Sequence, residues 1–81
     1  MNIIKLEKNL KKLLAKLFTV NIKNINIYSS NKSIKKWDSL GHIRLIMAIE
    51  QKYNIKIDQK HYSDLLNFKN LLRFVIKKSK K

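Results

Sequence analysis

Apolar residues recur at spacings of three and four between Ile3 and Phe18, with lysines on the remaining positions. This period is that of an amphipathic α-helix with one face toward a core. The positions that would share this face are Ile3, Leu6, Leu10, Leu13, Leu14 and Leu17. The pattern therefore predicts a first helix of about four turns.

The segment from Asn21 to Ser33 is rich in Asn and Ser and has no helical period. Ile22, Ile25 and Ile27 partly alternate with polar residues, which is also compatible with a short strand. Because a lone strand would have no partner, we expect a long loop held in place by these isoleucines.

A second helix is predicted to follow Asp38, a good N-cap residue, and to run to Tyr53. Asn54 suits the left-handed position just after the helix. The Ile55–Ile57 stretch would form a brief extended link.

Two further helical segments are expected in the last third of the chain. A short helix around His61 to Leu66 would end before Asn67. A final helix is predicted from the spacing of Phe68, Leu71, Leu72, Val75 and Ile76, and residues 77–81 would form a solvated basic tail. The expected fold is all-α, a single domain over residues 1–81: a small four-helix bundle of three longer helices and one short helix, with a long first loop.

The formal charge is extreme, because 19 Lys and Arg face only 5 Asp and Glu, which gives +14 on 81 residues. Residues 1–37 carry nine Lys and one acid, and residues 67–81 carry six bases and no acid. Residues 38–66, with four bases and four acids, are neutral. Such a charge is typical of nucleic-acid or membrane binders, but abundant Lys, Asn and Ile also fit an A/T-rich coding sequence.

Several function classes are excluded by composition. The chain has no Cys, so it forms no disulfide and no thiolate metal site. His42, Glu50, Asp58 and His61 lack metal-ligand spacing, and no metal is expected. Asp38, Ser39 and His42 lack the glycine-rich elbow that a hydrolytic triad requires. Lysines interrupt the first apolar stretch, from Ile3 to Phe18, so we expect no signal or membrane-spanning segment and a cytoplasmic protein.

The segment Trp37-Asp38-Ser39-Leu40 carries the most specific chemistry. It places Ser39 in the first turn of a predicted helix, directly after an acidic cap. A helix N-terminus has unpaired N–H groups and a positive dipole end, so it favours an anion. A phosphate esterified to Ser39 would be stabilised there, with Lys35 and Lys36 adding positive potential.

Three stretches of this sequence resemble acyl carrier proteins. They are Asp38-Ser39-Leu40, the apolar helix from Ile43 to Glu50, and Tyr53-Asn54-Ile55-Lys56-Ile57. The resemblance continues through Leu65 to Val75 and covers about half of the chain well. It implies a four-helix bundle in which Ser39 bears 4′-phosphopantetheine, attached from coenzyme A by a phosphopantetheinyl transferase.

The resemblance also implies a non-catalytic carrier that holds its cargo as a thioester and passes it to acyl- or aminoacyl-handling enzymes. By position, Ile49, Ile57 and Leu65 are candidates to shelter a cargo chain, although ordinary core packing is the better explanation for each of them. The cargo could be fatty acyl, polyketide or aminoacyl. We expect a monomer.

Departures from the family pattern concern the partners. His42 and Arg44 stand where the family commonly has acids, so partners with acidic or apolar docking faces are expected, as in a stand-alone carrier of a specialised biosynthetic pathway. The candidate docking residues are Trp37, His42, Ile43, Arg44 and Met47, with Asp38 and Leu40 as motif neighbours of Ser39. For Trp37, which lies at a loop–helix junction, a core position is the favoured alternative.

The alternative function is that of a basic helical module for anionic membranes or nucleic acid. The helix from Ile3 to Phe18 is cationic and amphipathic, as are helices that lie on membranes. However, its apolar stripe is needed to close the bundle, and no aromatic platform is interleaved with the basic residues. Nucleic acid is therefore not expected as a partner, and a membrane is the weaker alternative.

Overall fold

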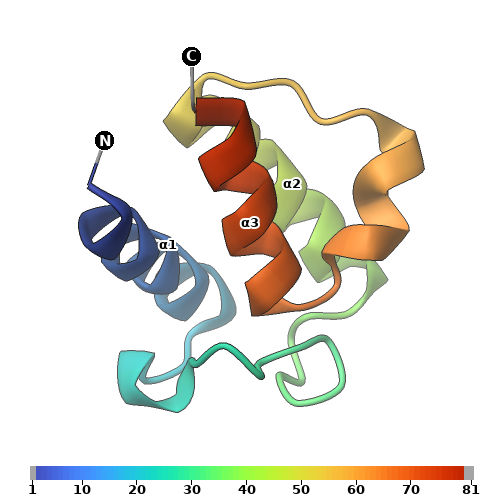
Figure 1. The fold of residues 1–81 in the computed structure, drawn as a ribbon. Helices are drawn as coiled ribbons and strands as arrows, with labels where there is room; N and C mark the ends of the chain where they lie inside the picture. The colour runs from blue at the N-terminus through green and yellow to red at the C-terminus, as the bar shows by residue number, and fades with distance from the viewer. Residues whose placement is uncertain (1, 80–81) are drawn as a thin grey trace.

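Three α-helices and two 3-10 helices follow one another in the computed structural model, which describes residues 2–79 (Figure 1). They are α1 (Ile3–Phe18), η1 (Ile22–Asn24), α2 (Ser39–Tyr53), η2 (Gln59–Leu65) and α3 (Phe68–Ser79). The described residues form no β-strand, and the predicted small helical bundle is confirmed. α1 lies on one side of α3 and η2 on the other, with α2 behind (Figure 1).

Helix α1 forms where the apolar period predicted it. The Asn2 side chain accepts a hydrogen bond from the Lys5 amide at 3.2 Å and so caps the helix. Leu10 and Leu14 are completely buried, and Phe18 is nearly so. Most of the amphipathic face thus closes the bundle, whereas Ile3 at its start is 50% exposed.

The core joins all three α-helices with the loop and the link that precedes η2. Its most buried side chains come from α1, α2 and α3, and Trp37 from the loop joins them. The side chains with no more than 1% exposure are Leu10, Leu14, Trp37, Leu45, Ile46, Ile49, Phe68, Leu71 and Val75. Such a core is sufficient for a chain of this length.

The loop between α1 and α2 is fixed by fewer isoleucines than predicted. Ile25 and Ile34 are buried, whereas Ile27 is 44% exposed and does not hold the loop to the core. Instead, the loop is tied to the start of α3, because the Phe68 amide donates to the Ser29 carbonyl at 2.8 Å. A single bridge between Ser30 and Asn67 marks this contact.

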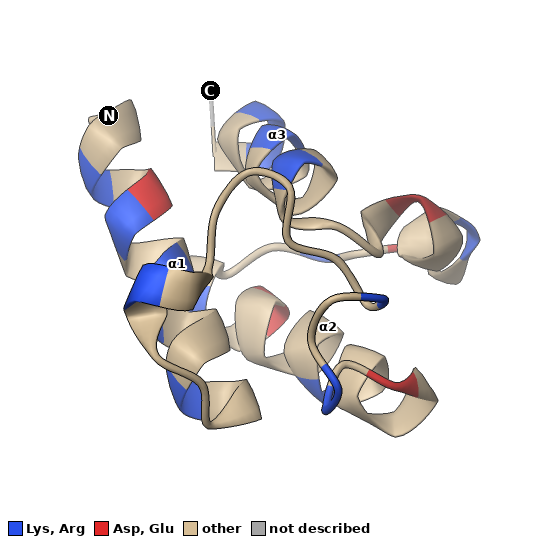
Figure 2. Cartoon of the chain, turned by 90° about the horizontal axis from the view of Figure 1, so that it is seen from below, with Lys and Arg blue, Asp and Glu red and all other residues tan. Residues whose placement is uncertain are grey.

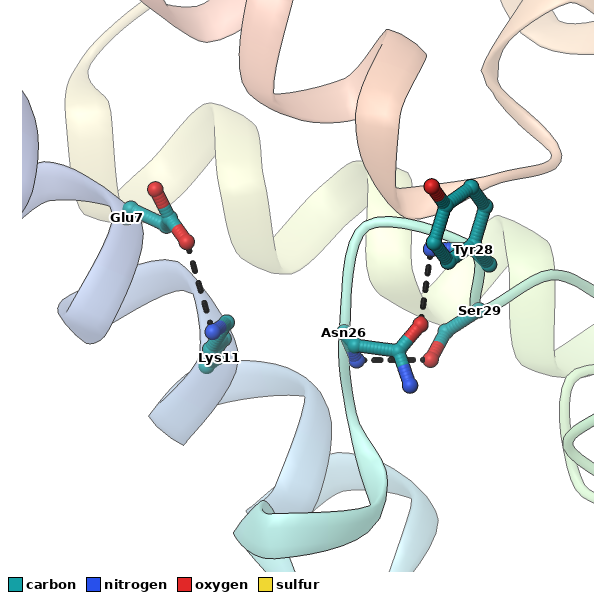
Figure 3. A network of polar contacts seen from close by, with 5 residues as sticks. All are labelled: Glu7, Lys11, Asn26, Tyr28 and Ser29. Atoms are coloured by element: carbon teal, nitrogen blue, oxygen red, sulfur yellow. Dashed lines mark hydrogen bonds and ion pairs between the residues drawn. The ribbon is translucent and has the colours of Figure 1, made fainter.

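A polar network closes the exposed turn of the same loop (Figure 3). The Asn26 side chain accepts from the Tyr28 amide at 2.8 Å, and the Ser29 hydroxyl accepts from the Asn26 amide at 2.9 Å. Local bonds of this kind stabilise Asn- and Ser-rich turns. They explain how an Asn-rich segment becomes ordered without a regular element.

The C-terminal elements differ from prediction at their ends. The short helix is a 3-10 helix that begins at Gln59 because the Asp58 side chain accepts from the Lys60 amide at 3.1 Å. Helix α3 continues to Ser79, so Lys77 and Lys78 are helical rather than part of a tail. Residues 80 and 81 of the expected tail lie outside the described residues.

The surface is cationic along both outer helices. Figure 2 shows Lys and Arg positions spread along α1 and α3, with acidic positions on η2. Within residues 2–79 the one ion pair joins Glu7 to Lys11, at 3.3 Å on successive turns of α1. The other basic side chains of α1 therefore face solvent without a carboxylate partner in the described part of the chain.

Candidate functional site

Ser39 is the first residue of α2 and its side chain is exposed. Directly before it, Asp38 has an extended backbone and caps the helix: its carboxylate accepts from the Gly41 amide at 2.8 Å. The Asp38 carbonyl accepts from the His42 amide, also at 2.8 Å. The cap thereby fixes the first turn and presents Ser39 at the positive end of the helix.

Gly41 lets the loop cross this first turn. A Cβ built at this position would lie far inside van der Waals distance of the Lys36 carbonyl oxygen, which is backbone and has no rotamer to change. Any other residue would push Lys36 away from α2. The close approach of loop and helix, and with it the position of Asp38, depends on this glycine.

Ser39 borders an open groove between the loop, α2 and η2. The groove measures about 550 Å³ and its lining is mixed: Trp37, His42, Ile43, Tyr62 and Leu66 together with Asn31, Lys35, Asp38 and Ser63. A second depression of about 340 Å³ lies toward the end of α1, where Lys36 and Arg44 stand beside Asp38. Cationic side chains therefore flank the start of α2 on both sides.

Trp37 and His42 are buried, at 1% and 6% exposure. The Trp37 indole donates to His42 Nδ1 at 2.9 Å, and His42 Nε2 lies 2.8 Å from the Tyr62 carbonyl oxygen. The prediction that His42 docks partners is therefore wrong, and Trp37 takes the core position that was its favoured alternative. Both are used inside the molecule, because a buried indole N–H and a buried imidazole need hydrogen-bond partners.

The same residues form an aromatic row through the bundle. Phe18 of α1 stacks on Trp37 with ring centroids 5.5 Å apart, Trp37 stacks on His42 at 6.2 Å, and Tyr62 meets His42 edge-on at 6.4 Å. The row connects the end of α1, the loop, α2 and η2. The row thereby fixes the segment that carries Ser39 to the core.

The outward face of α2 is apolar in its first two turns. Leu40 and Met47 are each 61% exposed, and Ile43 is 43% exposed. Arg44 is exposed beside them. This face, and not the buried pair Trp37 and His42, is available to another molecule.

The three candidate cargo-sheltering residues are buried: Ile49 at 0%, Leu65 at 2% and Ile57 at 5% exposure. Glu50 has a structural role beside them, since its carboxylate accepts from the Ile57 amide at 2.9 Å and fixes the link that follows α2. All three apolar side chains belong to the hydrophobic core.

The alternative function, a basic helical module for anionic membranes, would need the apolar face of α1 to be free. Leu6, Leu10 and Leu14 of α1 lie in the core, and Leu13 and Leu17 pack against it. No helix within residues 2–79 is both long and apolar enough to cross a bilayer.

Sequence reasoning missed two features of the site. The bond between His42 and Tyr62 joins residues 20 positions apart, which no local pattern reveals. The close approach of the Lys36 carbonyl to Gly41 is a contact between the loop and α2. A glycine within a helical period was the sequence signal that could have indicated it.

No family model matches the chain. The sequence is similar to the acyl carrier protein of Buchnera aphidicola subsp. Schizaphis graminum (strain Sg), with 29% identity over 75 residues. The match covers 93% of this chain and 95% of that relative. This similarity extends along nearly the whole chain and agrees with the helical bundle and with the exposed Asp38-Ser39-Leu40 turn, the features in which the chain resembles acyl carrier proteins.

Proposed function

We propose that this protein carries acyl or related intermediates as thioesters on a 4′-phosphopantetheine arm attached to Ser39. The observation that supports this most is the position of Ser39: an exposed hydroxyl at the first residue of α2, beside an open groove. The arm would supply a thiol, which the chain itself lacks because it has no Cys.

The surroundings of Ser39 fit the phosphodiester of such an arm. The first amides of α2 and the helix dipole favour a negative group there. Lys35 lines the groove on the η2 side, and Lys36 and Arg44 line the depression on the α1 side. Asp38 is directed at the Gly41 amide by its hydrogen bond, so the carboxylate is engaged as a cap.

A carrier of this kind acts by positioning and not by lowering a chemical barrier. A tethered cargo has a high effective concentration at each partner enzyme, which replaces diffusion of a free intermediate. Nothing in this role requires a catalytic side chain on the carrier. We therefore propose a substrate of a phosphopantetheinyl transferase that is itself not an enzyme.

The face formed by Leu40, Ile43 and Met47, with Arg44 beside it, is the proposed docking surface for partner enzymes. It is apolar with a cationic neighbour, so it suits partners whose docking sites are apolar or acidic. A strongly basic carrier of this type fits a specialised biosynthetic pathway with matched enzymes.

The experiment is arm attachment in vitro. The protein is incubated with coenzyme A and a promiscuous transferase, and the intact mass is measured. One added phosphopantetheine is expected for the wild type and none for Ser39→Ala. Ser63→Ala is the matched control, because Ser63 is also exposed and lines the same groove, and it is expected to react like the wild type. Absence of any added mass with several transferases contradicts the proposal.

A further inference from the structure

We infer that the cargo of this carrier is a short acyl group that stays in the groove beside Ser39, and that His42 is the positioning residue that keeps it out of the core. The inference rests on the proposed attachment of the arm at Ser39. It concerns which cargo the same site accepts and where that cargo lies.

His42 joins α2 to the segments on either side of the groove. An indole N–H only donates and a carbonyl oxygen only accepts, so Trp37 requires a free lone pair on Nδ1 and Tyr62 requires a proton on Nε2. One neutral tautomer of His42 satisfies both bonds at 2.9 and 2.8 Å. We call this unit of Trp37, His42 and Tyr62 the imidazole clamp.

The imidazole clamp closes the direct route from Ser39 to the interior. Its His42 and Tyr62 line the groove, and the buried Ile49 and Leu65 follow on the same elements, two turns after His42 on α2 and one turn after Tyr62 on η2. To reach these side chains, a cargo chain must separate η2 from α2. That movement breaks the bond between the buried His42 and the part-buried Tyr62 carbonyl, which is unfavourable.

The groove outside the clamp offers a mixed surface. Ile43 and Leu66 give it apolar area, while Asn31, Lys35 and Ser63 bring polar or charged side chains. With a volume of about 550 Å³ that must also admit part of the arm, it suits a small acyl group. A long alkyl chain together with the arm would exceed this volume.

The first test measures hydrogen exchange in the protein without an arm. His42→Phe keeps a ring in the core but removes both bonds, and the amides of residues 61–65 are expected to exchange on the order of tenfold faster. His61→Phe is the matched control: this second histidine of η2 packs against Phe74, with centroids 5.4 Å apart, and takes no part in the clamp. Should His42→Phe fail to fold, Trp37→Phe removes the indole donor alone. Equal exchange of residues 61–65 in wild type and variant overturns the inference.

The second test follows methyl resonances after loading with an octanoyl group from octanoyl coenzyme A. In the wild type, signals of Ile43 and Leu66 are expected to shift while those of Ile49 and Leu65 stay in place. In His42→Phe, the Ile49 and Leu65 signals are expected to shift as well. Shifts of these two residues in the wild type, or in neither protein, contradict the inference.

The two proposals fail in distinguishable ways. Intact mass reports whether Ser39 receives the arm, and if it does not, the proposed function fails. Hydrogen exchange of residues 61–65 is measured without the arm, so it tests the imidazole clamp independently of the proposed function.

Discussion

At the scale of single residues, two physical effects act in opposite directions when Gly41 is replaced. Alanine at an exposed helix position is more favourable than glycine by about 1 kcal/mol. At Gly41, however, a Cβ would clash with the Lys36 backbone, and such overpacking costs roughly 1–3 kcal/mol. Gly41→Ala is therefore expected to lower the free energy of unfolding in urea titrations. Gln51→Ala, at an exposed position of the same helix, should stay within about 0.5 kcal/mol of the wild type. A stabilised Gly41→Ala protein would show that the loop has room to move.

Tyr53 presents a buried hydroxyl that has no hydrogen-bond partner among residues 2–79. Burial raises the pKa of this phenol above its ordinary value of 10.0. The folded state therefore holds the phenol proton more tightly than the unfolded state. The contribution of this raised pKa to the free energy of unfolding is fully present below pH 10. It is lost as the pH rises further.

Tyr53→Phe removes both the unpaired hydroxyl and its titration. At neutral pH the variant is expected to equal the wild type or exceed it by up to about 1 kcal/mol, because no hydrogen bond is lost. Between about pH 8 and about pH 11 the wild type should lose more unfolding free energy than the variant. Since the lysines titrate in both proteins, the difference between them isolates Tyr53. An identical alkaline loss would contradict the assignment.

At the scale of elements, α1 and α2 end in the same way with different residues. Thr19 and Asn54 both adopt the left-handed conformation, with φ of 55° and 53°. Asn tolerates this region, whereas a β-branched residue is strained in it. Thr19→Asn is therefore expected to raise the free energy of unfolding by about 0.5–1 kcal/mol, and Asn54→Thr to lower it by a similar amount. Thermal or urea unfolding of the two variants checks the pair, and effects of the same sign would refute the strain argument.

The elements also show how far the sequence can be interpreted. Asp38 and Asn54 delimit α2 through local capping chemistry, so both ends of this helix and the exposed start at Ser39 could be predicted. The burial of Trp37 could be expected from its place at a loop–helix junction, but the burial of His42 could not, because it depends on a hydrogen bond to Tyr62 from a distant element. Sequence patterns near a helix report its ends and its faces, but not which polar side chains find partners across the fold.

At the scale of the whole molecule, self-repulsion follows from the +14 charge. Lys8, Lys12 and Lys16 stand one turn apart on the exposed side of α1, and each such like-charge pair costs about 0.2–0.5 kcal/mol. Raising the NaCl concentration from about 20 mM to about 500 mM shortens the Debye length below the spacing of most surface charges.

The melting temperature is therefore expected to rise with salt, by about 4–8 °C for each kcal/mol of repulsion removed. Lys12→Glu places a carboxylate between Lys8 and Lys16 and should both raise the melting temperature at low salt and reduce its salt dependence. A melting temperature that is flat or falls with NaCl would mean that repulsion does not limit stability.

Residues 38–66 carry no net charge, in contrast to the basic segments on either side, and Ser39 lies within them. The most direct test of the account is peptide mapping by tandem mass spectrometry after reaction with coenzyme A and a transferase. We predict a single phosphopantetheine on Ser39, with Ser33 and Ser63 unmodified although both are exposed. Modification of another serine, or of none, would contradict the central claim that the start of α2 is the site of a carrier arm.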